Sequence, residues 1–82
     1  MIDNKSLEQI RYYPLPFRIK KLRLLTGLSQ TEFGEKINIS QTTISMWEKG
    51  RSDPSERSLE RIVKAYELPF DFFLDIDVQR LE

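Results

Sequence analysis

The chain has 82 residues, enough for one compact domain with a small core and too few for two domains. It contains neither Cys nor His, which excludes disulfides, thiol or imidazole catalysis, and zinc sites built on the usual ligands. The net charge is zero, yet residues 1–51 carry nine basic and five acidic side chains (+4) and residues 52–82 carry four and eight (−4). Such a split indicates either a face for an anionic partner or simply solvated helix surface.

The N-terminal stretch MIDNKSLEQ lacks the basic and then apolar form of a signal peptide, and no apolar run is long enough to span a membrane. We therefore expect a cytoplasmic protein with no membrane contact. Residues 1–16 are expected to form an arm or a short extra helix, residues 17–74 the main domain, and residues 75–82 a C-terminal tail. Within the first part, SLEQIRYY could be a helical turn, an ordered arm or a frayed end.

Helical periodicity fills every segment that Pro and Gly mark off, and we find no strand pattern, repeat or low-complexity tract. The first helix of the main domain is expected over residues 17–26. Its apolar positions Ile19, Leu22 and Leu25 fall on one stripe. Gly27 suits the left-handed residue that ends many helices.

A capping box opens the next helix, which we expect at about residues 30–37. The Ser29 hydroxyl can accept a hydrogen bond from the Glu32 backbone N–H while the Glu32 carboxylate reaches back. Gly34 in the middle of this helix costs roughly 1 kcal/mol of helix propensity relative to Ala, which is reasonable if another helix backbone approaches closely there. Asn38 is expected to end the helix.

The segment SQTTISMWEKG predicts a third helix, at about residues 41–49, with Ser40 as its N-cap. Ser and Thr form helices less readily than Glu, Lys, Ala or Gln, so something other than helix propensity has selected them. At 100° per residue Ile44 and Trp47 share the inner face, and Trp47 is therefore expected in the core rather than stacked on a base. The opposite face is small, polar and mostly uncharged, with Thr42, Ser45, Met46 and Lys49 and, at its flank, Gln41.

A fourth helix is expected after the cap residue Ser55, and PFDFFL predicts a last short turn, counted as the fifth helix. The sequence therefore predicts an all-α, five-helix domain. The fourth helix has the apolar stripe Leu59, Ile62, Val63 and Tyr66, and the side chains expected to close the core from the last turn are Phe70, Phe73 and Leu74.

Two short capped helices joined by a three- or four-residue turn, the second with small polar groups outside, predict a helix-turn-helix. Side chains that enter the major groove of DNA must be short and must donate and accept hydrogen bonds at base edges. Gln can pair with adenine, Ser and Thr are adaptable, and Met46 can touch a thymine methyl group. Groove contact thus explains a composition that helix propensity does not.

The segment SQTEFGEKINISQTTISMWEKGRSDPSERSLERIVKAY resembles the phage-repressor and Cro type of helix-turn-helix, also called the Xre family, and the resemblance covers about residues 17–74. It implies a lambda-repressor-like five-helix bundle that regulates transcription, here expected as a repressor. It also implies a homodimer on double-stranded operator DNA with an inverted repeat. Phe33-Gly34 stands where Leu-Ala is more usual, and PFDFF is unusually aromatic for the last helix.

The resemblance also implies roles for single residues. Gln30 matches a position that touches a phosphate and braces the recognition helix, while Arg23 and Glu48 match a pair that bridges the first and third helices and leaves the Arg able to face a phosphate. Independently of the resemblance, the N-terminus of the second helix aims N–H groups at phosphate. The positions that read bases are matched by Gln41, Thr42, Ser45 and Met46. The positions that contact the DNA backbone are matched by Thr43 and Arg51, and we add Lys49 to them. Lys20, Lys21 and Lys36 could contact DNA or be solvated.

Other classes of function have less support in the sequence. We expect no enzyme, no cofactor and no metal, because there is no phosphate-cradling glycine loop and no nucleophile beside a base. Asp71, Asp75 and Asp77 lack the glycine and bidentate Glu of a calcium loop. A protein-interaction module, such as the antitoxin of a toxin–antitoxin pair, remains an alternative that an exposed patch with Phe70 and Phe72 would favour. The chain could also be one domain of a longer protein.

Overall fold

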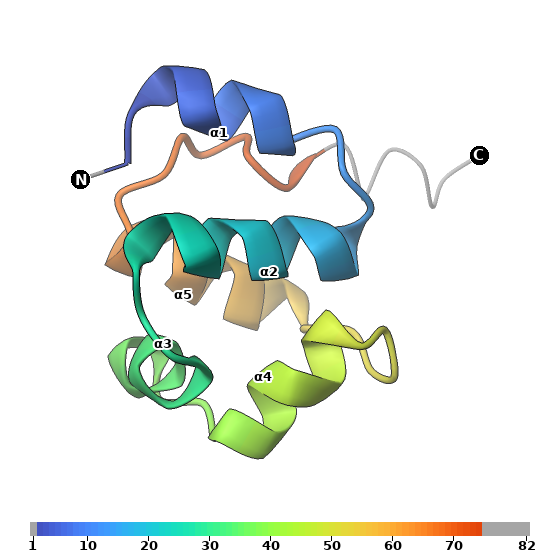
Figure 1. Cartoon of the computed structure of the whole chain (residues 1–82). Helices are drawn as coiled ribbons and strands as arrows, with labels where there is room; N and C mark the ends of the chain where they lie inside the picture. The colour runs from blue at the N-terminus through green and yellow to red at the C-terminus, as the bar shows by residue number, and fades with distance from the viewer. Residues whose placement is uncertain (1, 75–82) are drawn as a thin grey trace.

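The computed structural model describes residues 2–74. Within that range the helices are α1 (Asn4–Ile10), α2 (Leu15–Thr26), α3 (Gln30–Ile37), α4 (Gln41–Glu48) and α5 (Glu56–Ala65), and there is no strand. Figure 1 shows α1 on one side of α2, with α3 and α4 on the other side. The α5 helix lies behind α2 in this view and contacts α3. The predicted all-α, five-helix fold is confirmed. None of these helices is both long and apolar enough to cross a bilayer.

Side-chain caps start four of the five helices. Asp3, Ser29, Ser40 and Ser55 each accept a hydrogen bond from the backbone N–H three residues further on, so the three predicted Ser caps are confirmed. The predicted capping box is present, because the Ser29 N–H also donates to the Glu32 carboxylate at 2.9 Å. This backbone hydrogen bond lowers the pKa of Glu32.

Two left-handed residues end the helices on either side of Ser29. Gly27 has φ 77° and Asn38 has φ 60°, which confirms both predicted helix ends. The close approach expected at Gly34 exists, but the backbone that approaches belongs to the α3–α4 turn and not to a helix, while the Ile44 side chain of α4 lies close by. A Cβ atom on Gly34 would overlap the carbonyl oxygen of Ile39, whose N–H donates to the Gly34 carbonyl at 2.9 Å. The absence of a side chain here therefore allows the tight turn between α3 and α4.

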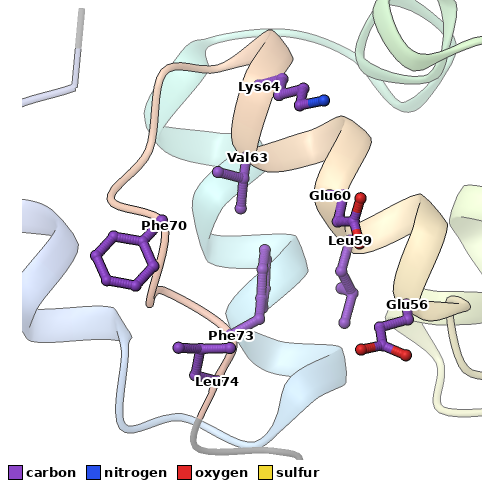
Figure 2. A pocket seen from close by; sticks show the side chains of 8 residues that line it. All are labelled: Glu56, Leu59, Glu60, Val63, Lys64, Phe70, Phe73 and Leu74. Atoms are coloured by element: carbon purple, nitrogen blue, oxygen red, sulfur yellow. The ribbon is translucent and has the colours of Figure 1, made fainter.

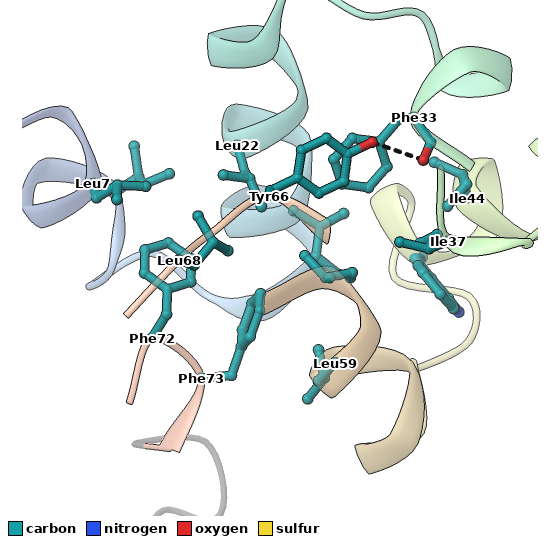
Figure 3. Close-up of a cluster of buried hydrophobic side chains, with 14 residues drawn as sticks. Leu7, Leu22, Phe33, Ile37, Ile44, Leu59, Tyr66, Leu68, Phe72 and Phe73 are labelled. Atoms are coloured by element: carbon teal, nitrogen blue, oxygen red, sulfur yellow. Dashed lines mark hydrogen bonds between the residues drawn. The ribbon is translucent and has the colours of Figure 1, made fainter. Parts of the chain in front are cut away.

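Fourteen buried apolar side chains form one core, drawn in Figure 3. The rings of Phe33 and Tyr66 stack with centroids 4.6 Å apart, and the Tyr66 hydroxyl donates to the Phe33 carbonyl at 2.9 Å. Burial raises the pKa of Tyr66 to about 12. Phe33 is fully buried, and the predicted burial of Tyr66 and Trp47 is confirmed. The core consists of Leu7, Ile10, Ile19, Leu22, Phe33, Ile37, Ile44, Trp47, Leu59, Ile62, Tyr66, Leu68, Phe72 and Phe73.

The N-terminal stretch contributes a helix that sequence reasoning left open. Residues 4–10 form α1, which packs on α2 and buries Leu7 and Ile10. Its Asp3 cap explains why the helix starts where it does, since the carboxylate accepts from the Ser6 N–H at 2.7 Å. That hydrogen bond also lowers the pKa of Asp3.

The C-terminal part of the described chain departs from the prediction. Residues 70–73 form the predicted short turn, and within residues 2–74 the fifth helix is α1 and not this segment. Phe73 is buried as predicted, but Phe70 and Leu74 are 83% and 47% exposed, and Phe72 takes the inner position. Helical spacing does not apply in a turn, so the prediction is wrong for Phe70 and Leu74 and right for Phe73. Residues 75–82, with Asp75 and Asp77, lie outside the described range.

A second difference concerns α2. Leu25, expected on the inner stripe with Ile19 and Leu22, is 42% exposed while the other two are fully buried. Three residues at 100° each turn the helix by about 300°, so Leu25 lies about 60° round the helix from Leu22. At the end of α2 that rotation is enough to bring the side chain out of the core.

Candidate nucleic-acid interface

The α4 helix buries Ile44 and Trp47 and turns a polar face outward. The predicted inner face is therefore confirmed. Of the four residues predicted to read bases, Gln41, Thr42 and Met46 are exposed and Ser45 is half-buried, so the structure brings all four together on one short helix. Met46 is the only large apolar side chain among them, at 39% exposed.

Behind this face, four side chains link three helices. Arg23 on α2 donates to the Glu48 carboxylate on α4, from Nε at 2.7 Å and from Nη2 at 3.1 Å. Gln30, the first residue of α3, donates to Glu48 Oε1 at 3.0 Å. Gln41, the first residue of α4, donates from Nε2 to Gln30 Oε1 at 2.6 Å. We call this path from Arg23 to Gln41 the bracing network.

The ion pair at the inner end of the bracing network is sheltered from water. The side chains of Arg23 and Glu48 are 12% and 4% exposed. Arg23 Nη1 also donates to the Leu28 carbonyl at 3.1 Å, and the hydrogen bonds to Glu48 raise the pKa of Arg23. The predicted bridge between these helices is confirmed. Because it is buried, losing one partner would leave the other charge uncompensated.

The donors and acceptors of the bracing network decide how both amides are turned. A carboxylate can only accept hydrogen bonds, so Gln30 must present its NH₂ group to Glu48 and its carbonyl oxygen to Gln41. Gln41 must then give one N–H to Gln30. Its carbonyl oxygen and its second N–H remain available on the exposed side. One acceptor beside one donor complements the N6 and N7 atoms of adenine.

The residues predicted to contact the DNA backbone lie at the two ends of α4. Thr43, near the start, is half-buried, and its hydroxyl accepts from the Ser40 hydroxyl at 3.0 Å. Lys49 and Arg51 are exposed in the loop after α4, which Gly50 turns with φ 73°. Neither cation forms an ion pair with any residue between 2 and 74, so both charges are available to an anion.

The N-terminus of α3 offers fewer backbone donors than the sequence suggested. The capping box uses the N–H groups of Ser29 and Glu32, and those of Gln30 and Thr31 remain in the first turn. Lys36 has a partner inside the protein, since its Nζ lies 5.1 Å from the centre of the Tyr66 ring. Lys20 and Lys21 are exposed on α2, the helix that also carries Arg23.

The direct bond between Gln30 and Gln41 was not foreseen from the residues themselves. Its signal in the sequence is positional: each Gln follows a Ser cap and so occupies the first position of its helix. A tight turn brings two such positions together, but the pattern alone does not say that the two amides meet.

Comparisons with known proteins identify the family of this chain. The family model described as Helix-turn-helix matches residues 19–73. The chain is 33% identical over 57 residues to the HTH-type transcriptional activator BcrR of Enterococcus faecalis. The aligned stretch covers 70% of this chain and 28% of that protein. It is 32% identical over 60 residues to the HTH-type transcriptional regulator ImmR of Bacillus subtilis (strain 168). This aligned stretch covers 73% of this chain and 47% of that protein.

A third relative is an uncharacterized HTH-type transcriptional regulator of Sinorhizobium medicae (strain WSM419), 29% identical over 75 residues, which cover 92% of this chain and 54% of that protein. The chain thus spans about a quarter to a half of the length of these relatives. No solved structure matches it significantly. The family match over residues 19–73, which contains both capped helices and their turn, shows that the chain belongs to the Cro/C1-type helix-turn-helix family.

Proposed function

We propose that the chain is a DNA-binding regulator of transcription that reads a specific duplex sequence with α4 in the major groove. Family membership and the names of its relatives support a DNA-binding transcription regulator. The bracing network carries the sequence-specific part of the proposal. It fixes the amide of Gln41 before any ligand arrives, and a fixed donor–acceptor pair loses little conformational freedom on binding.

In this proposal the base contacts come from the outer face of α4. Gln41 pairs with one adenine through its free carbonyl oxygen and N–H. Thr42 and Ser45 are short enough to donate or accept at neighbouring base edges, and Met46 contacts a thymine methyl group. Enzymatic activity has no part in this role.

The backbone contacts flank the base contacts. Gln30 keeps a second N–H for a phosphate and Thr43 contributes its hydroxyl. Lys49 and Arg51 contribute charges that form no ion pair within residues 2–74. Arg23 can face a phosphate only with its remaining protons, because Nε, Nη1 and Nη2 all donate within the protein. Its main role in the proposal is therefore to orient Glu48.

Regulation by occupancy follows from this mode of binding, and we favour repression. A homodimer on an inverted repeat would place two α4 helices about 34 Å apart, one turn of the duplex. The proposal includes a cytoplasmic location, where a regulator of this kind meets DNA.

Selection of bound sequences from a random duplex pool tests the proposal. The purified chain is used at two salt concentrations, because phosphate contacts alone give binding that is sequence-independent and strongly salt-dependent. We expect enrichment of an inverted repeat at both concentrations. If no sequence is enriched at the lower or at the higher salt concentration, specific DNA binding is contradicted and the protein-interaction alternative is favoured. That alternative keeps one observation in its favour, since Phe70 is exposed although Phe72 is buried.

A further inference from the structure

An apolar groove lies between α5 and the turn at residues 69–74 (Figure 2). Leu59 and Val63 line it from α5, and Phe70, Phe73 and Leu74 line it from the turn. Its volume is about 240 Å³. Sites for small molecules usually measure roughly 300 to 1,000 Å³, so the groove better suits one or two side chains of a protein partner.

The wall of this groove exposes large apolar side chains to water. Phe70 is 83% exposed and Leu74 47% exposed, whereas Phe73 beside them is buried. Large apolar side chains that stay in water at the edge of a groove are typical of a site that a partner covers.

The turn that carries Phe70 is held in place from behind. Arg18, only 2% exposed, donates from Nη1 to the Phe72 carbonyl at 2.9 Å. Arg11 donates to the Asp71 carbonyl at 3.3 Å and forms an ion pair with the Asp71 carboxylate at 3.5 Å. The groove therefore exists before a partner binds, and little ordering is required on association.

Acidic side chains border the apolar floor on the α5 side. Glu56 and Glu60 stand one helical turn apart, are both exposed and form no ion pair with any residue that the structure describes. Like charges four residues apart on a helix repel each other. A cation supplied by a partner would remove that repulsion. Lys64, one helical turn after Glu60, places a positive charge at the other end of the groove.

We propose that this groove docks an amphipathic helix of a partner protein, with apolar side chains between Phe70 and Leu59 and with Lys or Arg against Glu56 and Glu60. The chemistry of the groove defines the partner: an apolar pair one helical turn apart, flanked by basic residues. Figure 1 shows the 69–74 segment beside α1, across α2 from α3 and α4. The groove is thus separate from the outer face of α4, and one molecule can bind DNA and the partner together.

A library of single helices displayed on phage, randomised at the apolar and flanking positions, tests the docking site on the full chain. We expect selected helices to carry two large apolar residues at i and i+4 beside Lys or Arg. A synthetic peptide of the selected sequence should lose about tenfold or more in affinity, by fluorescence anisotropy, on Phe70→Ser, since a large apolar contact is removed. The double variant Glu56→Lys/Glu60→Lys should weaken the peptide and favour its charge-reversed version.

The matched control is Tyr12→Ser, because Tyr12 is 82% exposed but does not line the groove. Equal losses in the Tyr12 and Phe70 variants would overturn the docking site, as would no selected helix or a selection of acidic or uncharged helices. Sedimentation of the chain alone tests whether a second copy of the chain occupies the groove. A dimer that Phe70→Ser converts to a monomer would show that it does and would overturn the partner helix. The DNA selection does not involve these residues, so either proposal can fail without the other.

Discussion

The outer face of α4 and the groove beside α5 are each supported by an arginine, half-buried Arg23 for the first and buried Arg18 for the second, but in different ways. Arg23 donates to the Glu48 carboxylate, and this carboxylate orients the side-chain amide of Gln30. The Gln30 carbonyl oxygen then accepts a hydrogen bond from Gln41. Arg18 bonds to main-chain carbonyls of Tyr13 and Phe72. A surface that presents particular hydrogen-bonding atoms needs its side chains oriented, whereas a surface that presents apolar shape needs only its backbone placed.

Breaking the first support should have the largest effect. Glu48→Ala leaves Arg23 without its carboxylate in a sheltered site and releases Gln30, so we expect the free energy of unfolding to fall by about 3 to 5 kcal/mol. Urea unfolding followed by circular dichroism measures the loss. Glu60→Ala, at an exposed position on α5, is the control and should change stability by less than about 0.5 kcal/mol. A loss below 1 kcal/mol in Glu48→Ala would show that the pair is not a structural support.

Breaking the second support should destabilise the fold without touching sequence preference. Arg18→Met keeps most of the side-chain volume but removes the donors to two backbone carbonyls, and we expect a loss of about 2 to 3 kcal/mol. The variant should still select the same DNA sequence as the natural chain. A changed selected sequence would mean that the two surfaces are coupled. Arg57→Met, at an exposed position of α5, is the matched control.

The tip of the bracing network should govern one base pair. Gln41→Ala removes the oriented donor and acceptor, so preference at a single position should relax at a cost of about 1 to 3 kcal/mol in binding free energy. Competition binding with duplexes substituted at each position of the selected site measures this. Gln9→Ala, an exposed Gln on α1, should leave the preference intact. An equal loss for all duplexes would contradict base reading by Gln41.

The packing beneath α3 should weaken in strong alkali. Below pH 10.0 the Tyr66 hydroxyl keeps its proton in both the folded and the unfolded state. Between 10.0 and about 12 the unfolded chain loses that proton while the folded chain retains it, so stability falls as pH rises. We expect about 1 to 2 kcal/mol from this group. The stability difference between the natural chain and Tyr66→Phe should therefore shrink from pH 8 to pH 11.5, and a constant difference would contradict the raised pKa.

The smallest effect is expected at the edge of the surface that we propose contacts DNA. Arg51→Ala should weaken binding to all duplexes alike and reduce the slope of log affinity against log salt by about one unit, as for one lost phosphate contact. A titration over several salt concentrations gives the slope. An unchanged slope would remove Arg51 from the phosphate contacts and would narrow the interface to α4 and its immediate neighbours.

Local signals explain why much of the fold could be predicted. The caps at Ser29, Ser40 and Ser55 act within three residues, and the burial of Ile44 and Trp47 follows from helix geometry alone. Each of these features is decided by a segment shorter than one helix, and a single sequence contains that information.

Long-range contacts explain what could not be predicted. The inward position of Phe72 depends on hydrogen bonds from Arg18 and Arg11 to the turn, across 54 and 60 residues. The bond between Gln30 and Gln41 depends on the angle that the α3–α4 turn imposes. The roles of the base-reading residues remain predictions, since they concern atoms of a ligand that the sequence does not contain.

Trp47 is the one tryptophan of the chain, and its ring is 4% exposed on the inner face of α4. Indole emission shifts to longer wavelength when the ring becomes hydrated, so the emission of this residue reports whether α4 stays packed against the core. DNA on the outer face of α4 lies on the opposite side of the helix from the ring. An unchanged emission spectrum on adding duplex DNA would mean that α4 enters the major groove as a rigid body. A red shift would mean that the packing of Trp47 in the core loosens when DNA binds.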